Sequence, residues 1–196
     1  VPAPGRALLT AVREHFPHLC LVAENLGTIS PEVEALRAEF ALPGMVVLQF
    51  AFDGNPDNPY LNHRHSPIDI VYTGTHDNDT TMGWFESRSE EMRAKIYRHF
   101  DADQQGMPWL LIEQAMASPG ATAIIPWQDI LALDGKHRMN TPGTKEGNWL
   151  WRFRWEQLPP GIEFRIRGLL QQYDRTGEPV WHSEGEEVAC HAQTLG

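Results

Sequence analysis

Residues 68–80 read IDIVYTGTHDNDT, and this stretch decides how the rest of the chain is interpreted. An apolar, β-branched run, residues 68–73, stops at Gly74 and is followed at once by the polar tetrapeptide HDND, residues 76–79. A buried strand that delivers acid, imidazole and amide groups at its carboxyl end is typical of α/β proteins, which place their chemistry at one end of a parallel sheet. The stretch therefore predicts an α/β fold with a functional site directly after this strand.

Three further apolar runs have the character of buried strands, at residues 19–23, 45–52 and 121–125. Helices are predicted between and after the runs, at residues 5–16, from Ser30 to Pro43, from Asp79 past Phe85, from Ser89 to Phe100, at residues 108–117 and at residues 162–173. Strands that alternate with helices pair in parallel and are covered on both faces. Residues 1–177 are therefore expected to form about four βα units, and residues 178–196 an irregular C-terminal tail.

A complete (β/α)₈ barrel needs eight strands and about 250 residues. The chain has 196 residues, starts on a predicted helix and offers four strands. These features predict that it is part of a larger protein.

The composition limits the partners of the chain. Its net charge of −10 argues against nucleic acid and anionic membranes, because both require a positive surface. No apolar run is long enough to cross a bilayer, and the first residues lack the features of a signal peptide. The two cysteines, Cys20 and Cys190, have no metal-type spacing, which favours a reducing, cytoplasmic location.

Three consecutive predicted strands are followed by a carboxylate: Glu24, Asp53 and Asp77. Because parallel strands leave their carboxyl ends on one face of a sheet, these acids are expected to share that face. Paired carboxylates suit glycosidic bond chemistry, in which one acid protonates the leaving oxygen and another stays ionised beside an oxocarbenium-like centre. The three acids therefore favour a carbohydrate-active site.

Simpler interpretations exist for each acid. Asp79 is expected to cap the helix that follows it, and Asp53 could be an ordinary turn residue. Residues 76–79 could also supply metal ligands, although consecutive residues cannot all point at one ion. His63 and His65 lie in the preceding loop, where we expect solvated side chains, and they do not complete a metal site.

Four ordered groups of residues make the interpretation specific. They are AENLG (23–27); LPGM with QFAF (42–45 and 49–52); YTGTHDNDTT (72–81); and RMN, PG and GNW (138–140, 142–143 and 147–149). Together they closely resemble the 4-α-glucanotransferases, also called amylomaltases or disproportionating enzymes, over residues 21–155. The resemblance implies the C-terminal half of a TIM-type (β/α)₈ catalytic barrel, with strands equivalent to the fifth to eighth. It also implies α-1,4-glucans (maltodextrins) as substrates, with no cofactor and no metal.

The resemblance assigns roles by position. Glu24 matches the general acid/base of the family, and Asp77 matches the aspartate that stabilises the transition state. His76 matches a residue that hydrogen-bonds the sugar at the cleaved bond. Asp53 and Asn148 fall where the family makes further glucose contacts.

One part of the family pattern is absent from the chain. The nucleophilic aspartate of the family lies in an Arg-Ile-Asp-His-type motif, and no such motif occurs here. A retaining mechanism needs a nucleophile about 5–5.5 Å from the acid/base. We therefore expect a transferase fragment that is inactive alone and whose partner is the missing N-terminal half of the barrel. The alternatives are a glucan-binding or interaction module without turnover, and a metal-dependent hydrolase.

Overall fold

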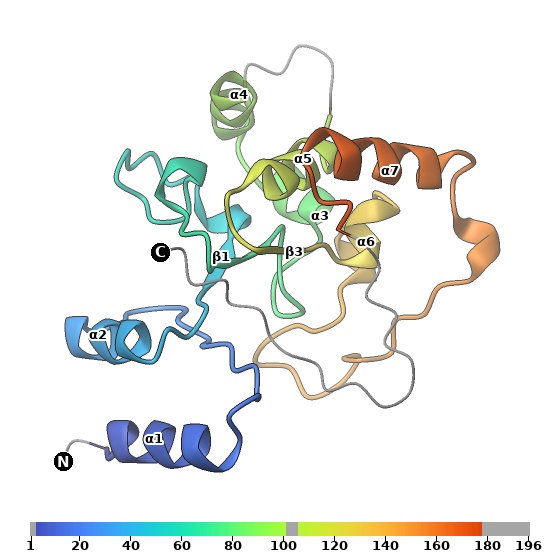
Figure 1. Cartoon of the computed structure of the whole chain (residues 1–196). Coiled ribbons are helices and arrows are strands. Elements are labelled where there is room, and N and C mark those ends of the chain that lie inside the picture. The colour runs from blue at the N-terminus through green and yellow to red at the C-terminus, as the bar shows by residue number, and fades with distance from the viewer. Residues whose placement is uncertain (1–2, 101–105, 178–196) are drawn as a thin grey trace. The chain divides into compact units, whose positions relative to one another are not determined.

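The computed structural model describes residues 3–100 and 106–177 (Figure 1). These residues form two compact units, the first made of residues 3–45 with Gly177 and the second of residues 46–176. The predicted tail, residues 178–196, lies outside the described residues, so its irregular character stays a prediction.

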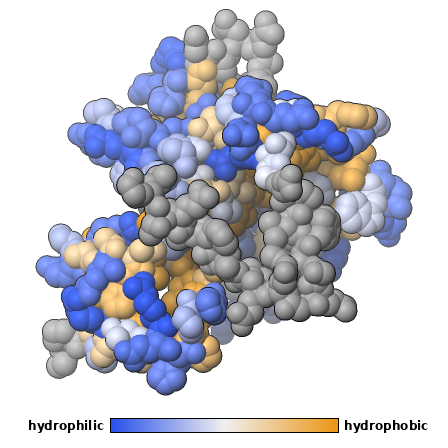
Figure 2. Space-filling model, viewed as in Figure 1, coloured by the Kyte–Doolittle hydropathy of each residue, from blue (hydrophilic) through white to orange (hydrophobic). Residues whose placement is uncertain are grey.

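The first unit contains two helices, α1 (Gly5–His15) and α2 (Pro31–Glu39), and both confirm the sequence prediction. They pack closely at Gly5, where a Cβ atom would lie 2.9 Å from Leu36 Cδ2. The helices bury little apolar surface, and Leu8 on α1 keeps 63% of its surface exposed. Figure 2 accordingly shows apolar colour on the visible face of this helix pair.

The predicted strand at residues 19–23 is wrong. Residues 19–26 have no regular secondary structure, and the Ala23 N–H makes a single hydrogen bond of 2.8 Å to the Pro43 carbonyl. An apolar run becomes a strand only where its backbone finds a ladder of partners, and one bond is not a ladder.

Apart from Met45, which belongs to the first unit, the second unit contains a three-stranded sheet of order β1 (Met45–Val47), β2 (Ile70–Tyr72) and β3 (Thr122–Ile124). β2 and β3 pair in parallel, with Val71 opposite Ala123. Parallel strands joined through helices confirm the predicted α/β class. β1 is shorter than predicted, because the chain turns into a 3₁₀ helix at Leu48–Phe50.

Five α-helices follow in the second unit: α3 (Thr81–Glu86), α4 (Glu90–His99), α5 (Trp109–Ala117), α6 (Trp127–Ile130) and α7 (Ile162–Gln172). Single 3₁₀ turns occur at Asn62–Arg64, Gly135–His137 and Trp155–Gln157. The sequence predicted all of the α-helices except α6. Within residues 3–100 and 106–177, none of the helices is both long and apolar enough to span a membrane.

Helix α5 joins two hydrophobic clusters. Its residues Leu111 and Ala115 pack with strand residues such as Val71 in one cluster. Trp109 and Ile112 pack with α7 in the other. Figure 1 shows α5 beside α7, with β3 next to them. The buried side chains of α5 therefore tie the sheet to the C-terminal helix.

The loop before β2 is held by a buried histidine. His65 is 7% exposed, although the sequence predicted a solvated side chain. Its Nδ1 lies 2.8 Å from Ser118 Oγ, and its Nε2 lies 3.0 Å from the Tyr60 carbonyl oxygen. Burial lowers the pKa of His65. The prediction failed because one of these partners, Ser118, lies 53 positions along the chain and is brought to His65 only by the tertiary structure.

Candidate functional site

The site loop, residues 73–80, leaves the carboxyl end of β2 and leads into α3. Asn78 Oδ1 accepts hydrogen bonds from the Thr75 N–H at 2.9 Å and from the Thr75 hydroxyl at 2.8 Å. These bonds close a tight turn, in which His76 and Asp77 occupy the exposed positions. The sequence prediction that a polar turn follows this strand is confirmed.

A buried carboxylate, Asp129 on α6, holds both ends of the site loop. Its Oδ2 accepts from the Thr73 hydroxyl at 2.6 Å and from the Thr81 hydroxyl at 2.8 Å. Its Oδ1 accepts from the Thr81 N–H at 2.7 Å. Asp129 is 1% exposed, and burial raises its pKa. A carboxylate with this many donors fixes the distance between the end of β2 and the start of α3.

Sequence reasoning missed Asp129. Its partners lie 48 and 56 positions away in the chain. Its place after the run at residues 121–125 was the available signal, because an acid at the end of a parallel strand faces the same sheet end as the site loop.

His76 and Asp77 are neighbours in space as well as in sequence. His76 Nε2 lies 3.4 Å from Asp77 Oδ1, and the two side chains are 53% and 52% exposed. The Trp149 ring packs against the His76 imidazole with a centroid separation of 5.1 Å. The pair therefore presents an imidazole and a carboxylate side by side, with an aromatic ring supporting the imidazole.

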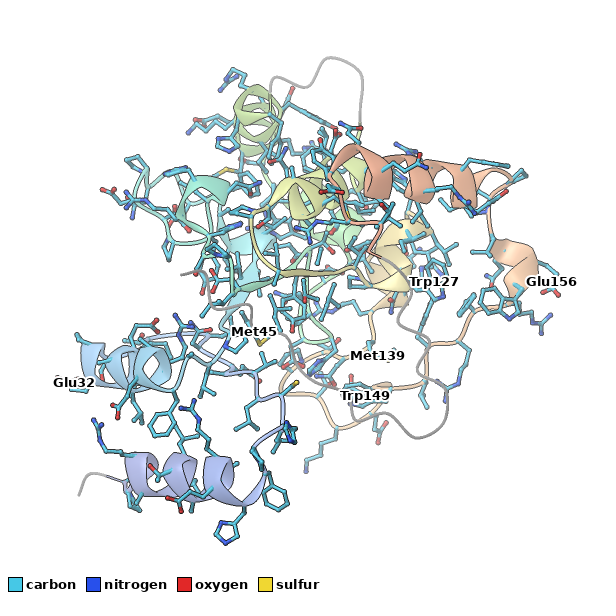
Figure 3. All side chains as sticks on the ribbon, in the orientation of Figure 1. Glu32, Met45, Trp127, Met139, Trp149 and Glu156 are labelled. Carbon is cyan, nitrogen blue, oxygen red and sulfur yellow. The ribbon has the colours of Figure 1, made fainter. Side chains whose placement is uncertain are left out.

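A pocket of about 230 Å³ opens beside His76, and Asp77 is not among the residues that line it. It is lined by polar and apolar residues from three segments: Thr75, His76, Asn78, Asp79, Thr80, Pro126, Gln128, Arg138, Met139 and Trp149. Two of these residues, Met139 and Trp149, lie close together (Figure 3). Hydrogen-bonding groups beside an exposed aromatic face suit a ligand that is polar at its edges and flat, such as a sugar ring.

Asp79 does not cap α3, which corrects the prediction. The N-cap is Thr80, whose side chain accepts a hydrogen bond from the Gly83 N–H at 3.0 Å. Asp79 Oδ1 instead accepts from the Thr80 N–H at 2.8 Å, and its Oδ2 lies 3.9 Å from an Arg138 nitrogen. Asp79 and Thr80 are both residue types that can cap a helix. Tertiary contacts decide which of them does so, here the pairing of Asp79 with Arg138.

Asp53 forms a turn. Its Oδ1 accepts a hydrogen bond from the Asn55 N–H at 2.8 Å, and this bond lowers the pKa of the exposed Asp53 carboxyl. The simpler interpretation of Asp53 as a turn residue therefore matches the structure. Its predicted glucose contact stays a prediction.

Asn148 organises its own loop. Its Oδ1 accepts from the Thr141 N–H at 2.9 Å, and its Nδ2 donates to the Thr144 carbonyl at 3.1 Å. These bonds place Trp149 at the point where the chain returns to the pocket. The predicted contact of Asn148 with glucose stays a prediction.

Glu24 is an exposed residue of the first unit. It follows the irregular segment described above, and its neighbour Asn25 accepts a hydrogen bond of 2.8 Å from the Met45 N–H. The expectation that Glu24 follows a strand is wrong, and its approach to Asp77 stays a prediction.

Among residues 3–100 and 106–177, no three His, Cys, Asp or Glu side chains are grouped so that they could hold a metal ion. The described part of the chain therefore offers the metal-dependent alternative no ligand set.

Comparison with known proteins decides the family. Residues 1–158 match the family model described as 4-alpha-glucanotransferase. The chain belongs to the 4-alpha-glucanotransferase family. A 4-alpha-glucanotransferase from Synechocystis is 45% identical over 93% of this chain and 36% of its own length. One from Thermus thermophilus is 42% identical over 89% of this chain and 37% of its own length.

Two further members extend the comparison. A 4-alpha-glucanotransferase from Arabidopsis thaliana, described as chloroplastic/amyloplastic, is 42% identical over 88% of this chain and 31% of its own length. The structure of the Streptococcus agalactiae amylomaltase in complex with acarbose superposes with a TM-score of 0.84 at 32% identity, covering 89% of this chain and 36% of that one. This chain thus spans about a third of the length of the 4-alpha-glucanotransferases it matches.

Proposed function

We propose that this chain supplies the general acid/base and the transition-state-stabilising aspartate of the active site of a retaining 4-α-glucanotransferase. The observation that carries the proposal is the exposed His76–Asp77 pair, held on a loop that Asp129 fixes at both ends, in a chain of this family. The complete enzyme would cleave an α-1,4-glucan, hold the donor segment covalently, and transfer it to the 4-hydroxyl of another maltodextrin.

Each proposed residue has a chemical role. Glu24 would protonate the departing glycosidic oxygen and then deprotonate the acceptor hydroxyl. Asp77 would hydrogen-bond sugar hydroxyls more strongly in the transition state than in the bound substrate, which is where such bonds accelerate a reaction. His76 would hydrogen-bond the same sugar, while Asp53 and Asn148 would contact neighbouring glucose units. The reaction would take place in the cytoplasm.

The parallel sheet supports a proposal for the arrangement of the whole enzyme. Residues 1–177 would form the C-terminal half of a (β/α)₈ barrel, with residues 178–196 as a tail. The nucleophilic aspartate would come from the N-terminal half, since these 196 residues lack the motif that carries it. The barrel half that bears the nucleophile is therefore the proposed partner of this chain, and the chain alone should not catalyse transfer.

Two experiments test the proposal. The isolated chain is incubated with maltotriose, and the expected result is no glucose and no longer maltodextrins. A full-length chimera is then made by replacing the matching segment of the Synechocystis 4-alpha-glucanotransferase with this chain. Glu24→Gln and Asp77→Asn should each lower its transferase kcat by about a hundredfold or more, whereas Asp57→Asn should not. Turnover by the isolated chain, or full activity of both variants, would contradict the proposal.

A glucan-binding module without turnover is the second candidate, and the pocket beside His76 and Trp149 favours it. Acarbose, the ligand in the Streptococcus agalactiae amylomaltase structure, is the probe. If the isolated chain binds acarbose and the chimera shows no transfer, this candidate replaces the first.

A further inference from the structure

The carboxylate of Asp77 is held by a segment that approaches it from outside the site loop. Asn140 Nδ2 donates a hydrogen bond of 2.6 Å to Asp77 Oδ1. Arg138 Nη2 donates a hydrogen bond of 3.0 Å to the main-chain carbonyl of Asp77. Both the side chain and the backbone of Asp77 are therefore contacted by residues 138–140, which lie more than 60 positions further along the chain.

Residues 138–140 are fixed by contacts that do not involve Asp77. Arg138 Nε donates to the Asn140 carbonyl at 3.2 Å, which orders the short segment itself. The Trp149 N–H donates to the Met139 carbonyl at 2.8 Å, which ties the segment to the far end of its loop. The backbone that carries the Asn140 side chain is therefore held independently of Asp77.

The two oxygens of Asp77 have different surroundings. Oδ1 receives the Asn140 bond and lies 3.4 Å from His76 Nε2. In the described residues Oδ2 has no hydrogen-bond partner, and the Asp77 side chain is 52% exposed. The contacts thus hold one oxygen and leave the other without a hydrogen-bond partner among the described residues.

We propose that Asn140 is a positioning residue, which locks the Asp77 side chain in one rotamer and so presents Oδ2 to the substrate. The catalytic purpose of this lock rests on the proposed function above, whereas the lock itself does not. An exposed aspartate without such a donor exchanges among its staggered rotamers. Because catalysis depends on groups held near their productive geometry, a freely rotating Asp77 would stabilise the transition state less well.

The first test measures the rotamer of Asp77 directly in the 196-residue chain. Three-bond couplings from the backbone N and carbonyl C to Cγ of Asp77 report its χ1 angle by NMR. We expect a single rotamer in the wild-type chain and averaged couplings in Asn140→Ala and in the isosteric Asn140→Asp, which lacks the N–H donor. The control Asn55→Asp makes the same chemical change in the exposed segment at residues 53–57 and should leave the couplings unchanged. The melting temperatures of all variants should stay close to that of the wild type.

A purely structural role would give the opposite pattern, with lower melting temperatures and an unchanged Asp77 rotamer. That result, or averaged couplings already in the wild-type chain, would overturn the proposal. The nearby charged groups, His76, Asp79 and Arg138, are identical in all of these variants, and Asn140→Ala adds no charge, so Asn140→Ala isolates the loss of the donor. Asn140→Asp also adds a carboxylate beside Asp77 Oδ1, which repels it, so Asn140→Ala decides the outcome.

The second test uses the full-length chimera with maltotriose as substrate. Asn140→Ala should lower kcat about tenfold with little change in KM, since the lock acts on an interaction made in the transition state. A higher KM with unchanged kcat would overturn the positioning role. The two proposals can fail separately. If Asp77 has a single rotamer but its replacement leaves transfer by the chimera intact, the proposed function is wrong. If Asp77 is essential for transfer but exchanges among rotamers in the wild-type chain, only the lock is wrong.

Discussion

At the scale of single residues, the buried carboxylate of Asp129 stabilises the site loop. Replacing it with alanine leaves the Thr81 N–H and two threonine hydroxyls without their buried acceptor. Asp129→Ala should therefore lower the free energy of unfolding by about 2–4 kcal/mol. Asp129→Asn keeps an oxygen that accepts from the Thr81 N–H, and its NH₂ group can donate to the threonine hydroxyl oxygens. The free energy of unfolding should therefore fall by less than about 1.5 kcal/mol in this variant. Urea denaturation measures both, and equal losses would contradict this account.

His65 makes stability depend on pH. Burial lowers its pKa in the folded chain below the ordinary value of about 6.5. The unfolded chain therefore takes up a proton at a higher pH than the folded chain, so protonation favours unfolding. Stability should fall as the pH drops through about 6.5 towards the lower folded pKa. Denaturation of the wild type and of His65→Gln between pH 7.5 and pH 5 checks this, and the variant should show a weaker dependence over that range. Parallel curves would show that His65 is not responsible.

At the scale of elements, two helical glycines should respond to alanine in opposite ways. A Cβ on Gly83 in α3 would lie 2.6 Å from Asp79 Oδ1 and 2.7 Å from the Gly135 Cα, so α3 and the following 3₁₀ turn would have to separate. A Cβ on Gly168 in α7 would meet nothing within 4 Å. Gly168→Ala should therefore stabilise the chain by about 0.5–1 kcal/mol, as alanine usually does in a helix. Gly83→Ala should destabilise it by about 1–3 kcal/mol. Thermal denaturation compares them, and a stabilising Gly83→Ala would contradict the close packing seen here.

The elements also explain how far the sequence could predict this fold. Helices α1, α2, α4, α5 and α7 were predicted because periodicity and end signals are local. The segment at residues 19–23 has equally apolar residues, but a strand also needs a partner backbone, which a local pattern does not contain. The same limit applies to the site. The exposed turn at His76 and Asp77 follows from a strand that ends in polar residues, whereas Asp129 and Asn140 depend on contacts across 48 to 63 positions.

At the scale of the whole molecule, the sheet has two edges. The order β1-β2-β3 places β1 and β3 outermost, and in the part of the chain that the structure describes no further strand pairs with them. Ile124 on β3 is 42% exposed, so this edge combines unpaired backbone groups with an apolar side chain. Such an edge is a template for pairing with another chain. In a complete barrel each edge would pair with a neighbouring strand. The isolated chain should therefore be less soluble than the complete barrel.

We therefore expect the isolated chain to self-associate as its concentration rises from about 1 to 100 μM, the range in which exposed strand edges promote association. Ile124→Lys should shift the association to higher concentration, because a lysine at a strand edge opposes pairing with a second copy. Phe164→Lys is the matched control, since Phe164 is 72% exposed but lies on the helix α7 and not on a strand. Sedimentation velocity distinguishes the outcomes. If Phe164→Lys and not Ile124→Lys abolishes association, the contact is a helix surface and the edge argument is wrong; a monomer at every concentration would show that both edges are already protected.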